Sequence, residues 1–433
     1  MKKMVLISCV LLTFIIGIYY YSNNNGFVLQ DEVGNQIINT NALTMMYETE
    51  YQSGEYQVSS DTLWPQDGYT FNAELSRCEN GSVLTWDDEN KKVLLQANTS
   101  DKCYVYFDVN PLLLAEYIIN KVYTGVDGEN GLYYHDGQGS YTNSDQEAGD
   151  NSYRYAGANP NNYVCFGSNE ESCPNNNLYR IIGVFEDKIK LIKHDYANSD
   201  LLGTNGAYLY FPYSQWGGES YYYKGDWDLS LLYLYNWANF YTNIWSESQI
   251  NTINLNTNYI TNIGSDWSSL IAEHTWQVGG ANYLQVIYNS TAKNTYNYEV
   301  GTSSANITYD AKIGLMYLND YYYGASPTYW SYSGYTTSTY PDANGNYGAD
   351  YDYRAAINEN WMFMGLNEWT ISRVSNDTDA AFRINPLGNI YFHYAHYGNS
   401  DSHGISLRPV FYLNPDVQYI SGTGTQTDQY RIS

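Results

Sequence analysis

The pattern of apolar and polar positions begins with an uncharged run from Met4 to Tyr21. Lys2 and Lys3 precede this run, and the next basic residue is Arg77. At a helical rise of about 1.5 Å per residue the run spans roughly 27 Å, which just reaches across the hydrocarbon core of a membrane. Because positive charge stays in the cytoplasm, the pattern predicts a single-pass membrane protein with a cytoplasmic N-terminus and an extracellular bulk. A cleaved secretory signal is the alternative, and it would release the protein on the same side.

The next part of the chain, between residues 36 and 108, has short β-branched and aromatic runs separated by turns. Strands are predicted over Tyr69–Leu75, Lys92–Gln96 and Cys103–Phe107, with a polar turn at residues 87–90. Apolar residues at helical spacing then predict a helix that follows Pro111 and ends at Tyr123. We therefore expect four parts: a membrane anchor or signal over residues 1–25, a small β-rich spacer over 26–110, a connecting helix and loop region over 111–177, and a head domain over 178–433.

The head domain begins with two apolar runs, Tyr179–Phe185 and Lys188–Lys193, on either side of a Glu186–Asp187 turn. This arrangement predicts a β-hairpin. Apolar residues at helical spacing predict a helix between Trp227 and Trp245, and residues 254–264 are predicted as a loop. Later apolar runs predict strands over residues 313–318, 361–373, 380–384, 389–394 and 407–413.

Composition limits the possible partners of the chain. The formal net charge is −26, from 46 acidic and 20 basic residues, and this balance disfavours nucleic acid but suits cations. The 51 tyrosines, together with many Asn, Ser and Gly residues, match the residue types of adaptable recognition surfaces. Drift in an AT-rich genome explains the same bias equally well.

Five cysteines are present, and Cys9 lies in the N-terminal apolar run. The other four form two local pairs, Cys78 with Cys103 and Cys165 with Cys173. In an oxidising exterior an even number of cysteines predicts disulfides, whereas weak oxidation would leave four free thiols.

Near the C-terminal end, residues 404–413 read GISLRPVFYL. This segment resembles the closing strand of C-type-lectin-like domains of the formylglycine-generating-enzyme (sulfatase-modifying factor) type. Residues 178–184 and 312–317 are similar to the same uncharacterised bacterial surface family, so the resemblance covers roughly residues 112–433. It implies a C-type-lectin-like head domain. Together with the N-terminal apolar run and the short strands described above, the expected fold class is α+β, with a C-type-lectin-like domain preceded by a small all-β sandwich-like module and an N-terminal transmembrane helix. The enzymes need a reactive cysteine pair late in the domain, but no cysteine follows Cys173 here, so the resemblance implies a binding scaffold.

In such domains the segment before the final strand forms an exposed ligand face. The candidate ligand-binding residues in this sequence are Tyr391, His393, Tyr394, His396, Tyr397, Asn399, Asp401 and His403, with Asn376, Asp377 and Asp379. Similar proteins include targets of diversity-generating retroelements, which suggests a hypervariable segment over residues 375–403. A plain solvated loop in a tyrosine-rich protein is the alternative.

Two metal sites are worth considering. Oxygen ligands at alternate positions, which calcium prefers, occur at Asp342, Asn344, Asn346 and Asp350. Asx-turns account for the same pattern. Three histidines near the C-terminus, with Asp401, offer zinc ligands, but positions 393 and 396 of a strand point to opposite faces.

These features predict a non-enzymatic binding protein, an adhesin or lectin-like receptor for a glycan or protein ligand, with calcium as the one candidate cofactor. The first alternative is an extracellular hydrolase acting on glycans, for which Asp226, Asp228 and Glu368 lie beside tryptophans. The second is a structural envelope protein without a ligand. No sequence motif of a nucleotide-binding or hydrolytic site is present.

Overall fold

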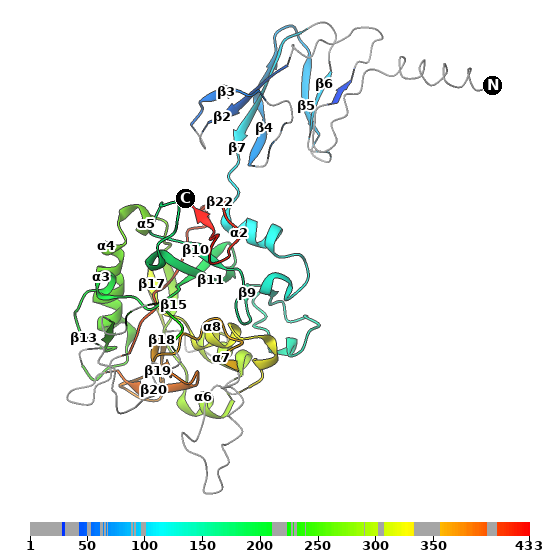
Figure 1. Ribbon diagram of the computed structural model, residues 1–433. Helices are drawn as coiled ribbons and strands as arrows, with labels where there is room; N and C mark the ends of the chain where they lie inside the picture. The colour runs from blue at the N-terminus through cyan, green and yellow to red at the C-terminus, as the bar shows by residue number, and fades with distance from the viewer. Residues whose placement is uncertain are drawn as a thin grey trace. The chain divides into compact units, whose positions relative to one another are not determined.

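The computed structural model divides the chain into two compact units, Met1–Leu112 and Leu113–Ser433 (Figure 1). The structure describes residues 28–30, 43–49, 53–60, 64, 66, 68–87, 90, 92–96, 101–209, 223–226, 228, 232–238, 240–289, 291–301, 307–332, 356–395 and 405–433.

The first unit contains two β-sheets that share one hydrophobic core. Its strands are β1 (Val28–Gln30), β2 (Leu43–Glu48), β3 (Tyr56–Val58), β4 (Tyr69–Cys78), β5 (Val83–Asp87), β6 (Lys92–Gln96) and β7 (Cys103–Val109). One sheet has the order β3-β2-β7-β4 and the other β1-β6-β5. Met45, Val105 and Phe107 of the first sheet pack with Val93 of the second. The predicted strands are therefore confirmed as β4, β6 and β7, along which inward-facing residues recur. Asp87 pairs with Lys92 across the predicted turn, of which residues 88 and 89 lie outside the described residues.

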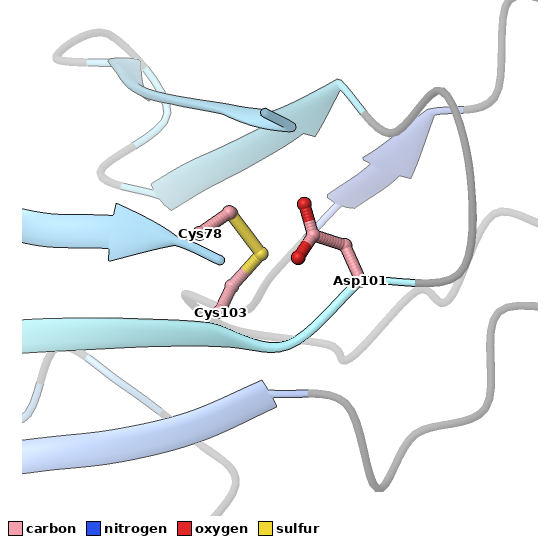
Figure 2. A group of neighbouring side chains, drawn as sticks. All are labelled: Cys78, Asp101 and Cys103. Atoms are coloured by element: carbon pink, nitrogen blue, oxygen red, sulfur yellow. A yellow bond between two sulfur atoms is a disulfide. The ribbon is translucent and has the colours of Figure 1, made fainter. Parts of the chain in front are cut away.

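A disulfide joins the ends of β4 and β7, where Cys78 and Cys103 lie opposite each other in the strand register. Figure 2 shows this bond with the Asp101 carboxylate beside it. The predicted pairing is confirmed. Disulfides persist in oxidising surroundings, so the bond points to an environment of that kind.

The second unit is built on a seven-stranded sheet. Its strands follow the order β17-β21-β12-β11-β9-β8, and β10 also pairs with β11. Their bounds are β8 (Leu132–Tyr134), β9 (Tyr153–Tyr155), β10 (Tyr163–Cys165), β11 (Leu178–Phe185), β12 (Lys188–Lys193), β17 (Ile313–Gly314) and β21 (Val410–Tyr412). The region over 113–177 thus contributes three strands to the sheet of the head.

The predicted hairpin forms the centre of this sheet, with β11 and β12 antiparallel. Seven of the eight residues of β11 are buried, which explains its continuous apolar run. Glu186 turns the chain with a positive φ of 57°. Gly183 lies at a bulge facing β9, where a Cβ atom would come within 2.2 Å of the Tyr153 carbonyl oxygen. Only glycine permits this close approach.

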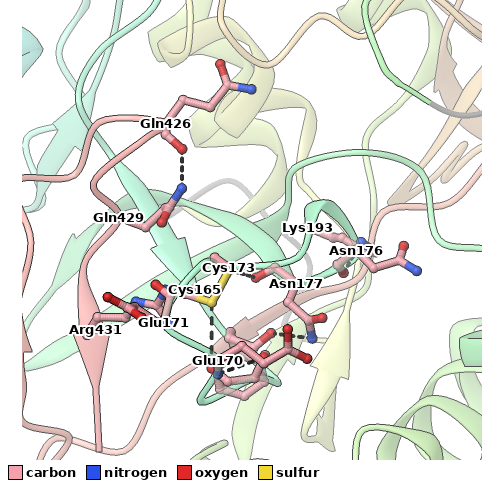
Figure 3. Close-up of a disulfide and its surroundings, with 12 residues drawn as sticks. Cys165, Glu170, Glu171, Cys173, Asn176, Asn177, Lys193, Gln426, Gln429 and Arg431 are labelled. Carbon is pink, nitrogen blue, oxygen red and sulfur yellow. Dashed lines mark hydrogen bonds between the residues drawn. A yellow bond between two sulfur atoms is a disulfide. The ribbon is translucent and has the colours of Figure 1, made fainter.

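A second disulfide, Cys165–Cys173, closes the loop between β10 and β11. Figure 3 shows the bonds that hold this loop. Arg431 donates to the Glu171 carbonyl oxygen at 2.7 Å, and Lys193 donates to that of Asn176 at 2.8 Å. The second predicted pairing is confirmed as well.

A separate three-stranded sheet comes later in the chain, in the order β18-β19-β20. Its strands are β18 (Glu368–Arg373), β19 (Ala380–Ile384) and β20 (Ile390–Tyr394). Three strand pairs complete the unit: β13 (Ala207–Leu209) with β14 (Tyr233–Tyr235), β15 (His274–Gln277) with β16 (Thr308–Ala311), and β22 (Tyr419–Ser421) with β23 (Arg431–Ile432).

The helices of the second unit are short. They are α2 (Leu114–Tyr117), η2 (Ile118–Val122), η3 (Glu129–Gly131), η4 (Ser144–Gln146), η5 (Asn175–Asn177), α3 (Ser199–Leu202), η8 (Trp245–Glu247), η9 (Ile250–Tyr259), α4 (Ile260–Asn262), α5 (Ser265–Ser269), α6 (Tyr283–Asn289), α7 (Ala292–Glu299), α8 (Leu318–Tyr323) and η10 (Pro327–Tyr329). The predicted helix after Pro111 is confirmed as α2 and η2.

The predicted α+β fold class is wrong, because the described residues are mostly β with few helices. The helix predicted between Trp227 and Trp245 does not form there. Residues 233–235 instead make β14, since aromatic residues suit strands and tertiary pairing overrides a short periodic pattern. Conversely, the loop predicted at 254–264 begins inside η9, where the buried Asn254 amide donates to the Leu202 carbonyl oxygen at 2.9 Å.

The predicted single-pass membrane localisation is also wrong as far as the structure can test it. Residues 4–21, which carry that prediction, lie outside the described residues. Among the residues that are described, no helix is both long and apolar enough to cross a membrane. The structure therefore does not support the predicted single-pass localisation.

Candidate ligand-binding site

The predicted ligand face begins on β20, the outer strand of the three-stranded sheet. Tyr391 lies opposite Arg383 of β19 in the strand register, and the Arg383 guanidinium lies 5.8 Å from the Tyr391 ring centroid. His393 is on the same face, with its ring 6.2 Å from that of buried Trp369. Strand alternation directs Tyr394 to the other face, where it is 51% exposed. The sequence-predicted residues of β20 are thus divided between two faces.

A neighbouring loop, residues 240–244, is attached to this sheet by Asn243. The buried Asn243 side-chain nitrogen lies 3.0 Å, 3.0 Å and 2.8 Å from the carbonyl oxygens of Val374, Asp377 and Ala380. Its backbone amide also donates to the Thr378 carbonyl oxygen at 3.0 Å. This set of hydrogen bonds, which we call the Asn243 clamp, fixes the loop against the turn between β18 and β19.

The clamped loop turns large apolar side chains toward solvent. Phe240 is 77% exposed, Tyr241 72% and Ile244 42%. The backbone amide of Ala238 donates to the carbonyl oxygen of Ala395, directly after Tyr394. Both ends of the loop therefore lie beside the sheet. We call the four exposed side chains Phe240, Tyr241, Ile244 and Tyr394 the aromatic rim.

Two carboxyl groups, those of Asp377 and Asp379, belong to the turn between β18 and β19, whose backbone is hydrogen-bonded to Asn243 and Ala395. Asp377 accepts a hydrogen bond from the Asp379 amide at 2.9 Å. Hydrogen bonds from the Asp379 backbone lower the pKa of Asp377, whereas burial and the neighbouring Asp377 carboxyl raise the pKa of Asp379. The Ala395 amide donates to the Asp379 carbonyl oxygen at 2.5 Å. This bond holds the end of β20 against the turn.

The third predicted turn residue, Asn376, has a structural partner. Its side-chain oxygen accepts a hydrogen bond at 2.9 Å from the amide of Tyr283, the first residue of α6. The Tyr283 ring packs edge-on against Phe392 of β20, with 4.8 Å between the centroids. Figure 1 accordingly shows α6 beside β19 and β20. Asn376 therefore helps to attach α6 to the sheet.

Several predicted residues cannot be placed. His396, Tyr397, Asn399, Asp401 and His403 lie outside the described residues, and so do the predicted calcium ligands Asp342, Asn344, Asn346 and Asp350. The zinc and calcium predictions therefore stay predictions.

Metal-ligating side chains gather once within the described residues, at Cys78, Asp101 and Cys103 (Figure 2). Zinc binds thiolates, and both sulfur atoms here are joined in the disulfide. Both Asp101 carboxylate oxygens accept backbone hydrogen bonds, from the amides of Asn80 at 2.8 Å and Ser82 at 3.0 Å. This group is therefore a disulfide with a turn-capping carboxylate.

Two of the acids considered for hydrolysis, Glu368 and Asp226, accept hydrogen bonds from other side chains. Glu368 is buried and accepts hydrogen bonds from Arg408 Nε at 2.7 Å and Nη2 at 3.0 Å. Asp226 accepts a hydrogen bond from the Asn175 side chain at 3.4 Å. Because its two oxygens both bond to Arg408, Glu368 is a structural acid.

The sequence reasoning missed the aromatic rim's main loop, since residues 240–244 were included in the helix predicted between Trp227 and Trp245. No signal in the pattern spoke against that helix, because Phe240, Tyr241 and Ile244 would lie on one apolar helical face. Comparison with protein-family models, curated proteins and solved structures finds no match to this chain. The resemblance to C-type-lectin-like domains stays a prediction.

Proposed function

We propose that this is a binding protein that recognises a glycan through the aromatic rim and the carboxyl groups of Asp377 and Asp379. The observation that carries the proposal is the high exposure of Phe240 and Tyr241 on a clamped loop. Large apolar side chains gathered at the surface of a folded unit mark interaction sites.

The chemistry of the surface favours a sugar. Aromatic rings stack on the apolar C–H faces of pyranose rings, and a tyrosine hydroxyl adds a polar contact. Carboxylate oxygens accept hydrogen bonds from sugar hydroxyls. The two acids of the turn supply such acceptors within the same backbone network that holds the loop.

The Asn243 clamp also supports the proposal, because it reduces the conformational entropy that the loop would lose on binding. Binding costs conformational entropy when a flexible loop must be ordered, and a loop that is already fixed avoids much of that cost. The clamp is thus consistent with a preorganised binding surface.

The direct test is a glycan array probed with the full chain, followed by calorimetry on any glycan that binds. The double variant Phe240→Ala/Tyr241→Ala is expected to weaken binding at least about 30-fold, because each stacked ring contributes on the order of 1 kcal/mol. Asp377→Asn/Asp379→Asn tests the acceptors separately.

A matched control is Val126→Ala/Ile420→Ala. These side chains are 59% and 56% exposed in the same unit but lie outside the aromatic rim, so binding should not change. Equal binding by wild type and the Phe240/Tyr241 variant contradicts the proposal. So does binding to proteins alone, and release of reducing sugar would indicate a hydrolase instead.

A further inference from the structure

A buried lysine and a buried aspartate touch each other in the interior of the second unit. Lys190 lies on β12 and Asp320 on α8, and each side chain is only 1% exposed. The distance from Lys190 Nζ to Asp320 Oδ2 is 2.6 Å. Because 129 other residues separate them in the chain, folding alone brings the amine to the carboxyl group.

The Lys190 amine is surrounded by aromatic rings. The ring centroids of Tyr317, Phe185, Tyr412 and Trp276 lie 4.7 Å, 5.4 Å, 5.5 Å and 5.9 Å from Nζ. Burial lowers the pKa of Lys190, with Asp320 acting in the opposite direction. Desolvation therefore favours the neutral amine, which is the nucleophilic form of lysine.

The Asp320 carboxyl group is only half satisfied. Oδ2 accepts from Lys190 and from the Tyr317 amide at 2.8 Å. Oδ1 is buried and has no hydrogen-bond partner among the described residues. The Arg154 Nη1 atom lies 3.9 Å from it. A buried carboxylate with one oxygen unpaired is costly.

The other charged groups of this region already have their own partners. Arg154 Nη2 lies 2.5 Å from Asp150, and Nε donates to Ser152 at 2.8 Å. Glu299 accepts from the amides of Leu318 and Asn319 at 2.9 Å and 2.8 Å. Loss of the charges on Lys190 and Asp320 together would therefore leave no buried ion without a partner.

We propose that Lys190 and Asp320 form an intramolecular amide cross-link. The lone pair of Nζ attacks Cγ of the protonated Asp320 carboxyl group and forms a C–N bond. The bond from Cγ to the protonated Oδ1 then breaks, this oxygen takes up a second proton and leaves as water, and the nitrogen loses its surplus proton. Oδ2 remains as the amide oxygen and keeps the hydrogen bond from the Tyr317 amide. Starting from the ion pair, the reaction converts one ammonium and one carboxylate into one amide and one water. No oxidant, reductant or co-reactant is needed.

The cross-link accounts for features that an ion pair leaves unexplained. It removes two charges from an aromatic interior and ends the need for a second partner at Oδ1. It joins a central strand of the main sheet to α8, so the link connects positions 130 residues apart in the chain. A lysine is required for this chemistry, since an arginine guanidinium stays protonated and is no nucleophile.

The test is the intact mass of the purified full chain after reduction and alkylation of its cysteines. The proposal expects a mass lower than the sequence mass by one water, and a tryptic peptide pair joined between Lys190 and Asp320 in fragment spectra. A wild-type mass equal to the sequence mass overturns the proposal, and no variant needs to fold for this measurement to decide.

Two variants locate the link. Lys190→Arg keeps the positive charge but cannot form the amide, so the full sequence mass should return. The matched control is Lys193→Arg, which changes another buried lysine of the same strand that bonds to the Asn176 carbonyl oxygen. Its mass should still be lower by one water. Loss of one water in the Lys190→Arg variant would contradict the assignment to Lys190.

Discussion

Two regions of the second unit use aromatic and charged side chains in opposite ways. Around Arg154 and Arg408 the charges are buried, and aromatic rings lie against them. At the aromatic rim the rings face solvent, and of the two acids in the adjoining turn Asp377 is exposed and Asp379 half-buried. The interior arrangement must contribute to stability because buried charges are costly without partners. The rim side chains are exposed instead, and their exposure supports the ligand that we propose.

The comparison gives a clear expectation for substitutions. Changes to the interior should lower the free energy of unfolding, and changes to the rim should lower ligand binding while they leave stability almost unchanged. The Asn243 clamp lies between these extremes, since it is buried but holds the rim in place.

The largest effect is expected from Glu368→Ala, which leaves the Arg408 guanidinium without its buried carboxylate. The free energy of unfolding should fall by about 3–5 kcal/mol. Urea unfolding followed by circular dichroism measures this change. The double variant Arg408→Met/Glu368→Leu removes both charges and should lose less than the single variant. A single variant as stable as wild type would show that the pair carries no interior stability.

The next largest effect is expected from Asn243→Ala. The substitution leaves the carbonyl oxygens of Val374 and Ala380 without the Asn243 amide and should lower the free energy of unfolding by about 1–3 kcal/mol. It should also weaken glycan binding, because the rim loop is released. Asn243→Asp is the matched variant of equal size that lacks the two amide donors. If stability falls but affinity does not, the clamp has no part in preorganising the surface.

A third effect concerns pH and the buried Glu299. Burial raises the pKa of Glu299 from 4.5 to about 7, against hydrogen bonds from Ser372 and Asn319. Between these two values the folded protein binds more protons than the unfolded chain, so this group's contribution to stability is lost as pH rises from 4.5 to 7. Each pH unit inside that window corresponds to about 1.4 kcal/mol.

The measurement is the difference in unfolding free energy between wild type and Glu299→Gln across pH 4 to 8. Burial also lowers the pKa of His194 to about 3, so the contribution of His194 to stability rises with pH, opposite to that of Glu299. Because both proteins contain His194, its contribution cancels in the difference. Relative to the variant, wild type should lose stability as pH rises. A flat difference curve would mean that Glu299 titrates normally.

Prediction from the sequence worked best for features that are formed by residues close together in the chain. The β11–β12 hairpin followed from two apolar runs and a tight turn, and β19 over Ala380–Ile384 was placed at its observed bounds. Both disulfides followed from local cysteine pairs in the chain. These features depend on neighbours in sequence, so pattern reasoning reaches them.

Features set by distant contacts were not predicted. The helix η9 forms although Asn and Thr are weak helix formers, because buried asparagine amides bond to carbonyl oxygens 49 to 56 residues earlier. The contact between Lys190 and Asp320 depends on the packing of β12 against α8, which no local pattern contains. The rim loop depends on Asn243 reaching a turn 131 residues away.

The smallest effect on stability is expected from Phe240→Ala/Tyr241→Ala. Both side chains are mostly exposed, so their truncation should change the free energy of unfolding by no more than about 0.5 kcal/mol. The same variant should show the largest loss of glycan binding. Thermal unfolding and calorimetry on one protein preparation measure both quantities. If the variant instead unfolds several degrees lower, the rings contribute to packing, and their exposure no longer argues for a ligand. A stable variant that has lost its glycan separates the two regions most sharply, because stability and recognition then reside in different side chains of one unit.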